Sequence, residues 1–553
     1  MGSLSRAALG CLLAIAIGKP HDAQASTLRV PQDHDSIQAA LDAASSGDTV
    51  LVAAGTYRER IRLKQGVALR SAGSDEKGML GLKRAEAVVI DGGGVGEQPG
   101  VLMAPDATLD GVTVTNCGLY EEAKWKEDWE TRGENQKHEH IGHFGTPAIG
   151  VVGATCVIVN CIVHHNGDTG IGIRGEKDKV CSPLVARNVC YRNMGGGIGS
   201  MNGSTATVED NICFENLYAG IGHDAAHPIV RRNRCYGNVR AGIGISNGSC
   251  PIVRNNTCYG NRRAGIGVRS TAATQPVIEQ NECYENEMAG IGSEDESQPI
   301  IRGNRCHHNK QAGIGSRNHA SPIIVGNEFV ENNEAGIGSR EGARPLIVRN
   351  TSSRNAAAGI GIQDGATVAV VVENRCVDNS RVALGLPDGA TAFVHGNHFE
   401  RVGGMPPLVA IRGQSNALMT DNEIRGGGVA GILVQGRAKL DGNRFFGRGP
   451  GQGIAVWIWE GSHVDVADNR FEGYANAVNA TASRVSVTGN TVQDFQKTAI
   501  IVRKPSAPPV VANNVAISTE ESDTPVQVDG GAGYIQNNAK RAAAAENVRD
   551  PQE

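Results

Sequence analysis

Aromatic residues are scarce in this chain: Phe, Trp and Tyr make up 4% of its 553 residues. Beyond the first 25 residues no apolar run is long enough to cross a bilayer, which excludes a membrane-spanning helix from that part of the sequence. No segment keeps the three-and-four spacing of apolar residues that a long helix needs. The formal net charge of −5 gives no reason to expect a nucleic-acid partner.

A repeat dominates what is present. The chain has 73 glycines, and the tripeptide Gly-Ile-Gly recurs every 22 to 27 residues. It opens at Gly170, Gly197, Gly220, Gly242, Gly265, Gly290, Gly313, Gly336 and Gly359. A fixed period of this length is typical of a solenoid, in which each repeat buries its apolar face only against its neighbours. Within residues 228–244 apolar and polar positions follow the alternation of strands, so we predict short strands stacked coil on coil into parallel sheets.

A second frame, Asn-x-Cys-x-x-Asn, repeats in step with the first. Its central position holds Cys190, Cys213, Cys235, Cys258, Cys283, Cys306 and Cys376. Phe329 and Phe399 take that position in other coils, so the column is expected to point into the core, with buried thiols packed as small apolar groups. The flanking Asn side chains are expected to form hydrogen-bonded ladders between coils. A disulfide, if formed, is expected among the out-of-frame Cys156, Cys161, Cys181 and Cys250.

The opening segment and the repeat together resemble a known family. Residues 28–33 (LRVPQD), 36–44 (SIQAALDAA), 47–50 (GDTV) and 55–57 (GTY) are similar to the first segment of the pectin-lyase-like superfamily. The repeat resembles the carbohydrate-binding and sugar-hydrolase type β-helix proteins of that superfamily. The resemblance implies an all-β fold, a single right-handed parallel β-helix of about 23 residues per coil. It leaves the function open, because the superfamily holds lyases, hydrolases, esterases, epimerases, adhesins and inactive binders.

Residues 27–540 are expected to form one domain, because a solenoid grows without a single globular core. We expect roughly 17 coils at a spacing of about 4.8 Å, which would give a rod of roughly 80 Å. Residues 34–46 have a helical pattern that Asp35 or Ser36 can cap. This short helix is expected to cover the open end of the rod.

Three further segments differ from the repeat. Residues 1–25 are typical of a secretory signal peptide, which predicts a periplasmic or secreted protein. Residues 118–145 form a long charged insertion between two coils, and Trp125 and Trp129 would anchor it over one face of the rod. Residues 541–553 are expected to be a frayed or helical tail.

The glycines of the repeat suggest a binding face. If Ile221 points inward, Gly220 and Gly222 point outward, and the repeats make two bare columns on one side of the rod. A strip of glycine usually means that something approaches the backbone closely. The alternatives are a polymer chain, a protein partner docked along the strip, the 118–145 insertion, or only a local role in a sharp bend.

Two residues after each second glycine, a neighbouring outward column holds Arg174, Met201, Asp224, Ser246, Arg269, Glu294, Arg317, Arg340 and Gln363. Lyases of the resembled superfamily pair acidic residues, often holding calcium, with an Arg or Lys that removes a proton beside a uronate carboxylate. The resemblance therefore implies Arg269 and Arg317 as catalytic candidates, and Arg340 as a substrate-binding one, since Arg can bind carboxylate in a bidentate manner. Asp224, Glu294 and Asp295 are the candidate calcium ligands. The alternative is a chance mix of exposed charges, and no diagnostic lyase, epimerase or pectinesterase motif is visible.

Two other groups could carry function. Alternation points both Trp457 and Trp459 outward, where paired indoles suit stacking on sugar faces or packing under a loop. His138, His140 and His143 share one loop and could bind a transition metal, although they lack the spacing of a known zinc motif. His223 is expected to be a hydrogen-bonded histidine that points inward.

These observations support three functional hypotheses. The first is an exported protein that binds or modifies an acidic polysaccharide along the glycine face, with β-elimination or epimerisation as the preferred chemistry and calcium as the candidate cofactor. The second is a non-catalytic structural or adhesive scaffold. The third is a periplasmic metal-handling protein of the kind that assists copper-enzyme maturation, using the histidine loop.

Overall fold

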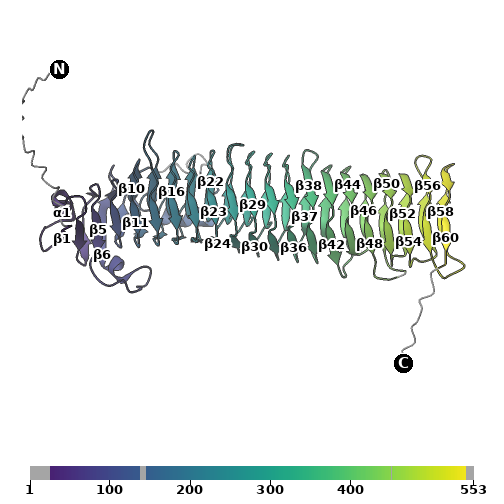
Figure 1. Cartoon of the computed structure of the whole chain (residues 1–553), viewed down its shortest axis with the longest axis horizontal. Coiled ribbons are helices and arrows are strands. Elements are labelled where there is room, and N and C mark those ends of the chain that lie inside the picture. The colour runs from purple at the N-terminus through teal and green to yellow at the C-terminus, as the bar shows by residue number, and fades with distance from the viewer. Residues whose placement is uncertain (1–24, 137–144, 450, 543–553) are drawn as a thin grey trace, which may run out of the picture.

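A computed structural model describes residues 25–136, 145–449 and 451–542 as one long straight rod (Figure 1). In these ranges 60 short strands stack into three parallel sheets, which we call sheets A, B and C. One coil consists of β20 (Ile229–Arg231) in sheet A, β21 (Arg234–Tyr236) in sheet B and β22 (Ile243–Ser246) in sheet C. This is the all-β parallel β-helix that the repeat predicts.

The rod is longer than expected. Sheet A has 21 strands, from β1 (Thr27–Val30) to β59 (Tyr534–Gln536). At a strand spacing of about 4.8 Å the stack extends about 96 Å. The estimate of 17 coils was too low because the coils before residue 118 carry neither repeated frame. Among the described residues, no helix is long and apolar enough to span a membrane.

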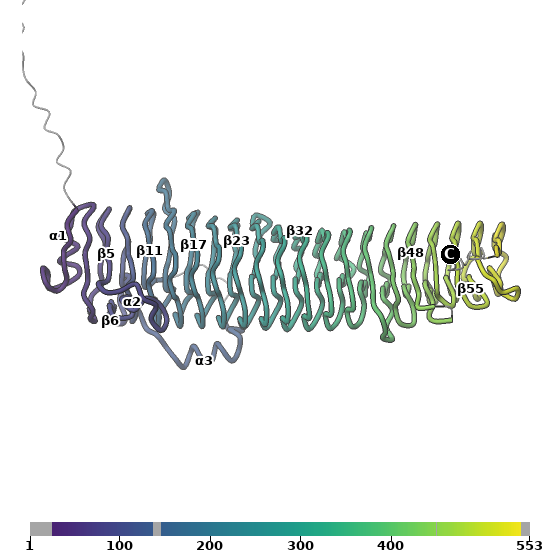
Figure 2. Tube along the Cα trace, turned by 60° about the horizontal axis from the view of Figure 1, so that its bottom comes forward, coloured from purple at the N-terminus to yellow at the C-terminus, as the bar shows by residue number. Residues whose placement is uncertain are grey.

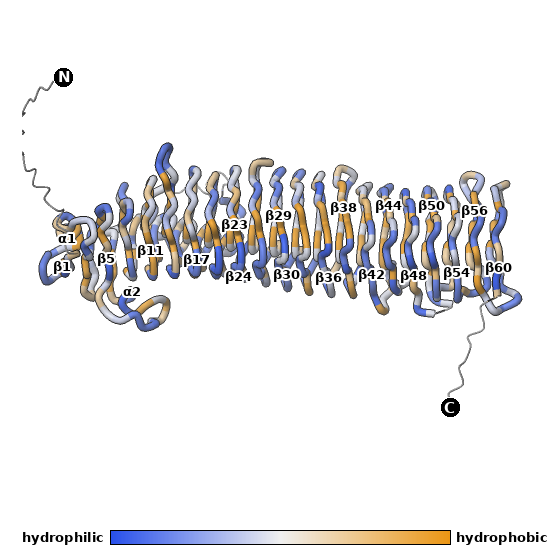
Figure 3. Tube along the Cα trace, viewed as in Figure 1, coloured by the Kyte–Doolittle hydropathy of each residue, from blue (hydrophilic) through white to orange (hydrophobic). Residues whose placement is uncertain are grey.

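The inward side chains form continuous columns. Ile221, Ile243 and Ile266 follow one another in register in sheet C and are fully buried. Apolar and polar stretches alternate along each coil, as strand geometry requires (Figure 3). The core is therefore a stack of identical layers in which each apolar side chain packs on its counterpart one coil away.

Asparagine ladders hold the corners between sheets. The Asn233 amide nitrogen donates to Asn256 Oδ1 at 3.0 Å, and Asn256 donates in the same way to Asn281 at 2.9 Å. A second ladder runs through Asn238 and Asn261. Each side-chain amide also donates to a backbone carbonyl of the preceding coil. Buried polar groups at the corners are thus satisfied, as the sequence frame predicts.

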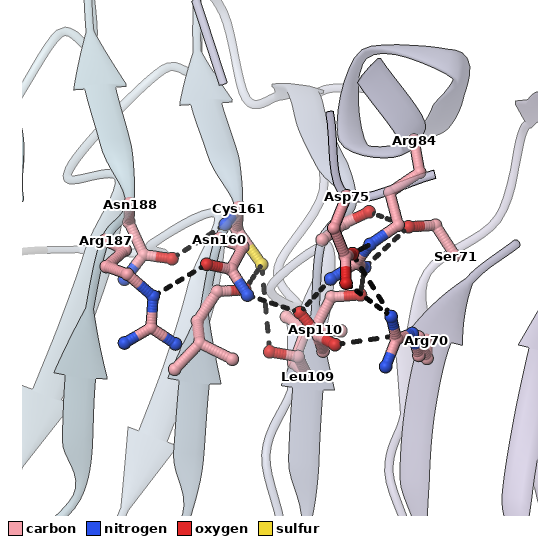
Figure 4. Close-up of polar contacts among 12 residues, drawn as sticks. Arg70, Ser71, Asp75, Arg84, Leu109, Asp110, Asn160, Cys161, Arg187 and Asn188 are labelled. Atoms are coloured by element: carbon pink, nitrogen blue, oxygen red, sulfur yellow. Dashed lines mark hydrogen bonds and ion pairs between the residues drawn. The ribbon is translucent and has the colours of Figure 1, made fainter. Parts of the chain in front are cut away.

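Near the N-terminal end a buried arginine joins several coils (Figure 4). Arg84, on α2 (Lys83–Ala87), lies 2.5 Å from Asp75 and 2.7 Å from Asp110 and also donates to Ser71 Oγ. Asp110 in turn accepts from the Asn160 amide at 2.7 Å. The arginine is satisfied by carboxylates on both sides, which a buried cation requires.

The predicted N-terminal cap is present as α1 (Ile37–Ala43). Ser36 Oγ accepts from the Ala39 backbone nitrogen at 3.1 Å, and the Glu59 carboxylate accepts from the Ile37 and Gln38 nitrogens. Ile37 and Leu41 are fully buried against the first coils. The helix therefore closes the apolar end of the rod.

The insertion carries α3 (Glu122–Glu130), which runs along the outside of the rod (Figure 2). Trp125 is buried against Met194, Leu217 and Val239. It stacks on Trp129, with the two ring centroids 5.3 Å apart. Its indole nitrogen donates to the Glu215 carbonyl at 2.7 Å. The insertion is therefore packed on coils that lie far from it in sequence.

Candidate functional site

A trough runs along the outer face of sheet C. Its strands are β22, β25 (Ile266–Val268), β28 (Ile291–Ser293), β31 (Ile314–Ser316), β34 (Ile337–Ser339) and β37 (Ala358–Ile362). We call it the glycine trough, because only small residues form its floor: Ala241, Gly244, Ala264, Gly267, Ala289, Gly292, Ala312, Gly315, Ala335, Gly338, Ala358 and Gly361. Two adjoining hollows, both open to solvent, make up the trough.

The two glycines of each tripeptide have different surroundings, which corrects the expectation that both face outward. A Cβ on Gly244 would meet only the Ala219 methyl group, at 3.5 Å. A Cβ on Gly242 would lie 2.7 Å from the Gly265 carbonyl oxygen and 2.9 Å from the Asn261 amide nitrogen. The second glycine lines the trough, whereas the first is buried at the corner because the asparagine ladder leaves no space for a side chain.

Two rows of side chains border the floor. The upstream row precedes each floor alanine and consists of Arg240, Arg263, Met288, Gln311, Glu334 and Ala357. The downstream row consists of Ser246, Arg269, Glu294, Arg317, Arg340 and Gln363, as alternation predicts. The strand register places Arg269, Glu294 and Arg317 on three consecutive coils. The structure therefore brings Arg269, Arg317 and Arg340 together on one wall.

The trough is cationic although the whole chain carries a net charge of −5. Among the described residues, its walls hold five arginines against Glu294 and Glu334, and Glu341 pairs with Arg340 at 3.2 Å, which leaves an excess of two positive charges. Burial and the nearby Arg263 and Arg269 lower the pKa of Arg240 to about 9. Burial and the nearby Arg269 also lower the pKa of Arg263. Mutual repulsion in a partly desolvated site favours binding of an anion.

One ion pair lies within the downstream row. Arg317 Nη2 lies 2.9 Å from Glu294 Oε1, and this hydrogen bond raises the pKa of Arg317. The buried Arg317 Nε has no hydrogen-bond partner among the described residues. Glu294 thus orients Arg317 within the downstream row, while the buried Nε stays without a partner in the described chain.

The insertion borders the N-terminal end of the trough. Arg263 donates to the Arg132 and Gly133 carbonyls at 3.0 and 2.7 Å, and Arg262 donates to the Trp129 carbonyl at 3.0 Å. The Arg132 and Gly133 carbonyls hold the Arg263 guanidinium in the upstream row. The insertion therefore positions a trough residue as well as covering the rod.

Trp457 and Trp459 lie on the same face but outside the trough. In register, the column of Gly361 continues through Gly385, Ala410 and Leu433 to Trp457. The two indoles meet edge to face at 5.4 Å, and Trp459 is exposed. Both point outward as predicted, four coils beyond the end of the trough.

The candidate calcium ligands are not brought together. The register places Asp224 beside Ser246, and therefore three coils, or about 14 Å, from Glu294. Asp295 lies on the following turn and accepts from the Asn318 amide at 3.0 Å. Within the described ranges no group of three His, Cys, Asp or Glu side chains could hold a metal ion.

The histidine loop cannot be placed, because His138, His140 and His143 lie outside the described residues. His223 does point inward, but neither of its ring nitrogens has a hydrogen-bond partner in the described chain. Burial lowers its pKa to about 3. The expectation of a hydrogen-bonded core histidine was therefore wrong: of its in-register neighbours, Ile245 has no polar group, and the Ser200 hydroxyl makes no hydrogen bond to it in the described chain.

The twelve described cysteines are free thiols, including the four out-of-frame residues. The in-frame cysteines stack in register from Cys190 to Cys306 and are fully buried. Burial raises the pKa of Cys376 to about 12, so its thiol is protonated. This column belongs to the core and not to a reactive site.

Sequence reasoning missed an aromatic ladder on the outer face of sheet B. Its members follow the cysteine of each frame: Tyr191, Phe214, Tyr236, Tyr259, Tyr284 and His307. Their ring centroids are 4.8 to 5.0 Å apart and their planes lie within 12° of each other. The sequence signal was the Tyr, Phe or His that directly follows every in-frame cysteine except Cys376. Because the ring faces stack on one another, only their edges are open to a ligand.

Comparison with known proteins addresses the fold. The chain resembles the A-module of a mannuronan C-5 epimerase from Azotobacter vinelandii, at 15% identity and a TM-score of 0.29, covering 78% of this chain and 94% of that one. The catalytic unit of a GH87 α-1,3-glucanase from Streptomyces thermodiastaticus is 12% identical with a TM-score of 0.35, and the match covers 68% of this chain and 61% of that one. The periplasmic alginate epimerase AlgG is 14% identical with a TM-score of 0.28, and the match covers 69% of this chain and 81% of that one. Likenesses this distant assign no function.

No curated protein matches the chain. A family model described as the right-handed β-helix region matches residues 139–276, 267–399 and 407–544, which together span well over half of the sequence. The three parallel sheets and the in-register coils of the structure agree with that match. The chain belongs to the right-handed β-helix family.

Proposed function

We propose that the glycine trough binds an acidic polysaccharide, with the polymer running along the rod across successive coils. The observation that carries this proposal is the excess of arginine in the trough of a chain that is negative overall. Concentrating positive charge in one concave site favours an anionic ligand over a neutral one.

The shape of the trough supports a polymer. Its floor offers only hydrogen atoms and methyl groups over six consecutive coils, a length of about 24 Å between the first and last strand. A flat chain can lie on such a floor without displacing side chains. The repeated geometry suits a ligand that is itself a repeat.

The downstream row would supply the recognition. Arg269, Arg317 and Arg340 are spaced along the trough, and each guanidinium can form two parallel hydrogen bonds to a carboxylate. Binding a carboxylate would also relieve the repulsion that lowers the pKa of Arg240 and Arg263.

Binding a uronate carboxylate between arginines also favours proton removal from the adjacent carbon, because the developing negative charge is stabilised. Arg269 or Arg317 is the group proposed to assist β-elimination or epimerisation there. The proposal assigns no step to calcium, since Asp224 lies three coils from Glu294 and Asp295 and the three carboxylates do not converge.

The test is to measure binding of a panel of uronate polymers and of neutral glucans by isothermal titration calorimetry. We expect binding of one or more uronate polymers, weakened by salt, and no binding of the neutral polymers. The double variant Arg269→Gln/Arg317→Gln should lose at least tenfold in affinity. The matched control Arg302→Gln/Arg354→Gln removes two exposed arginines of sheet A and of the turn after sheet B, outside the trough, and should bind like the wild type.

Ultraviolet absorbance of unsaturated product, and the mass of the product, would report turnover in the same samples. Absorbance that the wild type produces and Arg269→Gln/Arg317→Gln does not would support a lyase. Binding by the wild type with no absorbance and no change in product mass would support a non-catalytic binder. Absence of binding across the panel, or equal binding by trough and control variants, would refute the proposal.

A further inference from the structure

An aliphatic stripe covers the outer face of sheet A. The strands are β20, β23 (Ile252–Arg254), β26 (Val277–Glu279), β29 (Ile300–Arg302), β32 (Ile323–Val325), β35 (Leu346–Val348), β38 (Val368–Val372), β41 (Thr391–His395) and β44 (Asn416–Thr420). One outward position in each gives the stripe: Ile229, Ile252, Val277, Ile300, Ile323, Leu346, Val370, Phe393 and Leu418.

The stripe is exposed and uninterrupted. Eight of its nine side chains keep 37 to 48% of their surface open to solvent, and Val277 is half-buried. The column has Thr207 before it and Lys439 and Asp465 after it, so the apolar run is bounded at both ends. Monomeric proteins rarely expose so long an apolar run, and a continuous one marks an interaction surface.

Its area suits a dimer. If a residue of this size exposes roughly 180 Å² when extended, 40% exposure leaves about 70 Å² each and about 650 Å² for the stripe. Two copies face to face would cover about 1,300 Å², within the range of about 1,200 to 2,000 Å² of stable specific interfaces. Val325, Val348 and Val372, in the next outward column, widen the patch near its middle.

The bordering column holds charges of both signs, Glu209, Arg231, Arg254, Glu279 and Arg302, whose net charge of +1 repels an identical surface only weakly. Arg231 is paired with Glu209 at 2.5 Å, and Arg302 is paired with Glu279 at 2.5 Å, each within one chain. An in-register parallel sheet of this kind is flat enough to meet a second sheet at about 10 Å. A two-fold axis would then join the same patch on both copies.

We propose that sheet A is the interface of a homodimer, in which the stripes of two chains pack against each other. The trough on sheet C is outside this interface, so the dimer does not depend on the proposed function. The apolar stripe excludes water along nine coils, which supplies the driving force for association.

The test is sedimentation equilibrium of the full chain over a range of concentrations. We expect the wild type to have twice the mass of one chain, and Ile300→Lys/Ile323→Lys to have the mass of one chain. The matched control Thr257→Lys/Thr351→Lys adds the same charge to the outer face of sheet B and should remain dimeric. Because all four residues point outward, circular dichroism should show an unchanged fold in each.

A single variant, Ile252→Lys, tests the same surface at another coil and should raise the dissociation constant at least tenfold. A wild type that stays monomeric at every concentration would overturn the proposal. A dimer that survives both stripe variants would place the interface elsewhere and would overturn it as well.

Discussion

At the scale of single residues, the two glycines of one tripeptide give opposite expectations. Gly242→Ala should destabilise the protein by about 1–3 kcal/mol, because the new Cβ would overlap the Gly265 carbonyl and the Asn261 amide. Gly244→Ala should be neutral or stabilising by about 0.4–1 kcal/mol, because its Cβ makes only an ordinary contact with the Ala219 methyl group at 3.5 Å and the unfolded chain loses freedom. Thermal and urea unfolding midpoints of the two variants decide this, and equal losses in both would contradict it.

A second residue-scale prediction concerns acid stability. The pKa of His223 is about 3 in the fold because burial disfavours its charged form, compared with about 6.5 in the unfolded chain. Between these values the unfolded chain binds the extra proton, so the stability that depends on a neutral His223 is complete above pH ~6.5 and declines as the pH falls toward 3.

His223→Ile should therefore flatten the decline of the unfolding midpoint between pH 7 and pH 4. It should also add about 1–3 kcal/mol at neutral pH, because two unpaired ring nitrogens leave the core. Isoleucine already stands at the equivalent position, Ile245, one coil away. A variant whose midpoint follows the wild-type pH profile would show that the histidine is paired or hydrated in solution.

At the scale of elements, the insertion depends on one tryptophan. Trp125→Ala removes a buried indole and its hydrogen bond to the Glu215 carbonyl. It also removes the contact with the Arg192 guanidinium, which lies 4.1 Å from the ring centroid. Residues 119–136 should then open locally, with faster amide hydrogen exchange and proteolysis, while the unfolding midpoint of the rod changes little. Trp459→Ala, at an exposed indole, is the control. Unchanged exchange in residues 119–136 would show that other contacts hold the insertion.

The insertion also shows where sequence reasoning stops. The spacing of Trp125 and Trp129 within a charged segment was enough to predict that they anchor it. It could not predict which coils they contact, since Arg262 lies 133 positions away from the Trp129 carbonyl that it binds. Strand alternation gave the direction of Arg269 and Arg317, because the period of two is local. Their neighbours Arg240 and Arg263 were missed because they lie at turns, where alternation does not apply.

The same limit explains the calcium candidates. Asp224 and Glu294 stand in one outward column, which the repeat predicts correctly. Counting the coils between them would have shown that they lie too far apart to share an ion. The column predicts which face a side chain occupies, whereas a site also needs proximity along the rod.

At the scale of the whole molecule, the ends of the stack need protection because a parallel sheet there presents unpaired backbone groups. Leu41→Lys places a charge in the buried side of α1 and should expose the first coil, giving concentration-dependent association in light scattering. Ala43→Lys, at an exposed position of the same helix, should scatter like the wild type. Equal scattering by both variants would mean that α1 does not protect this end.

The in-register stacking of the coils has a consequence for how such a protein changes over time. Every coil from β22 to β37 contributes the same floor and two wall positions to the trough. A duplication or deletion of one complete repeat by unequal recombination would therefore lengthen or shorten the trough by about 4.8 Å and preserve its cross-section. The number of repeats in the gene then sets the length of ligand that the trough accommodates.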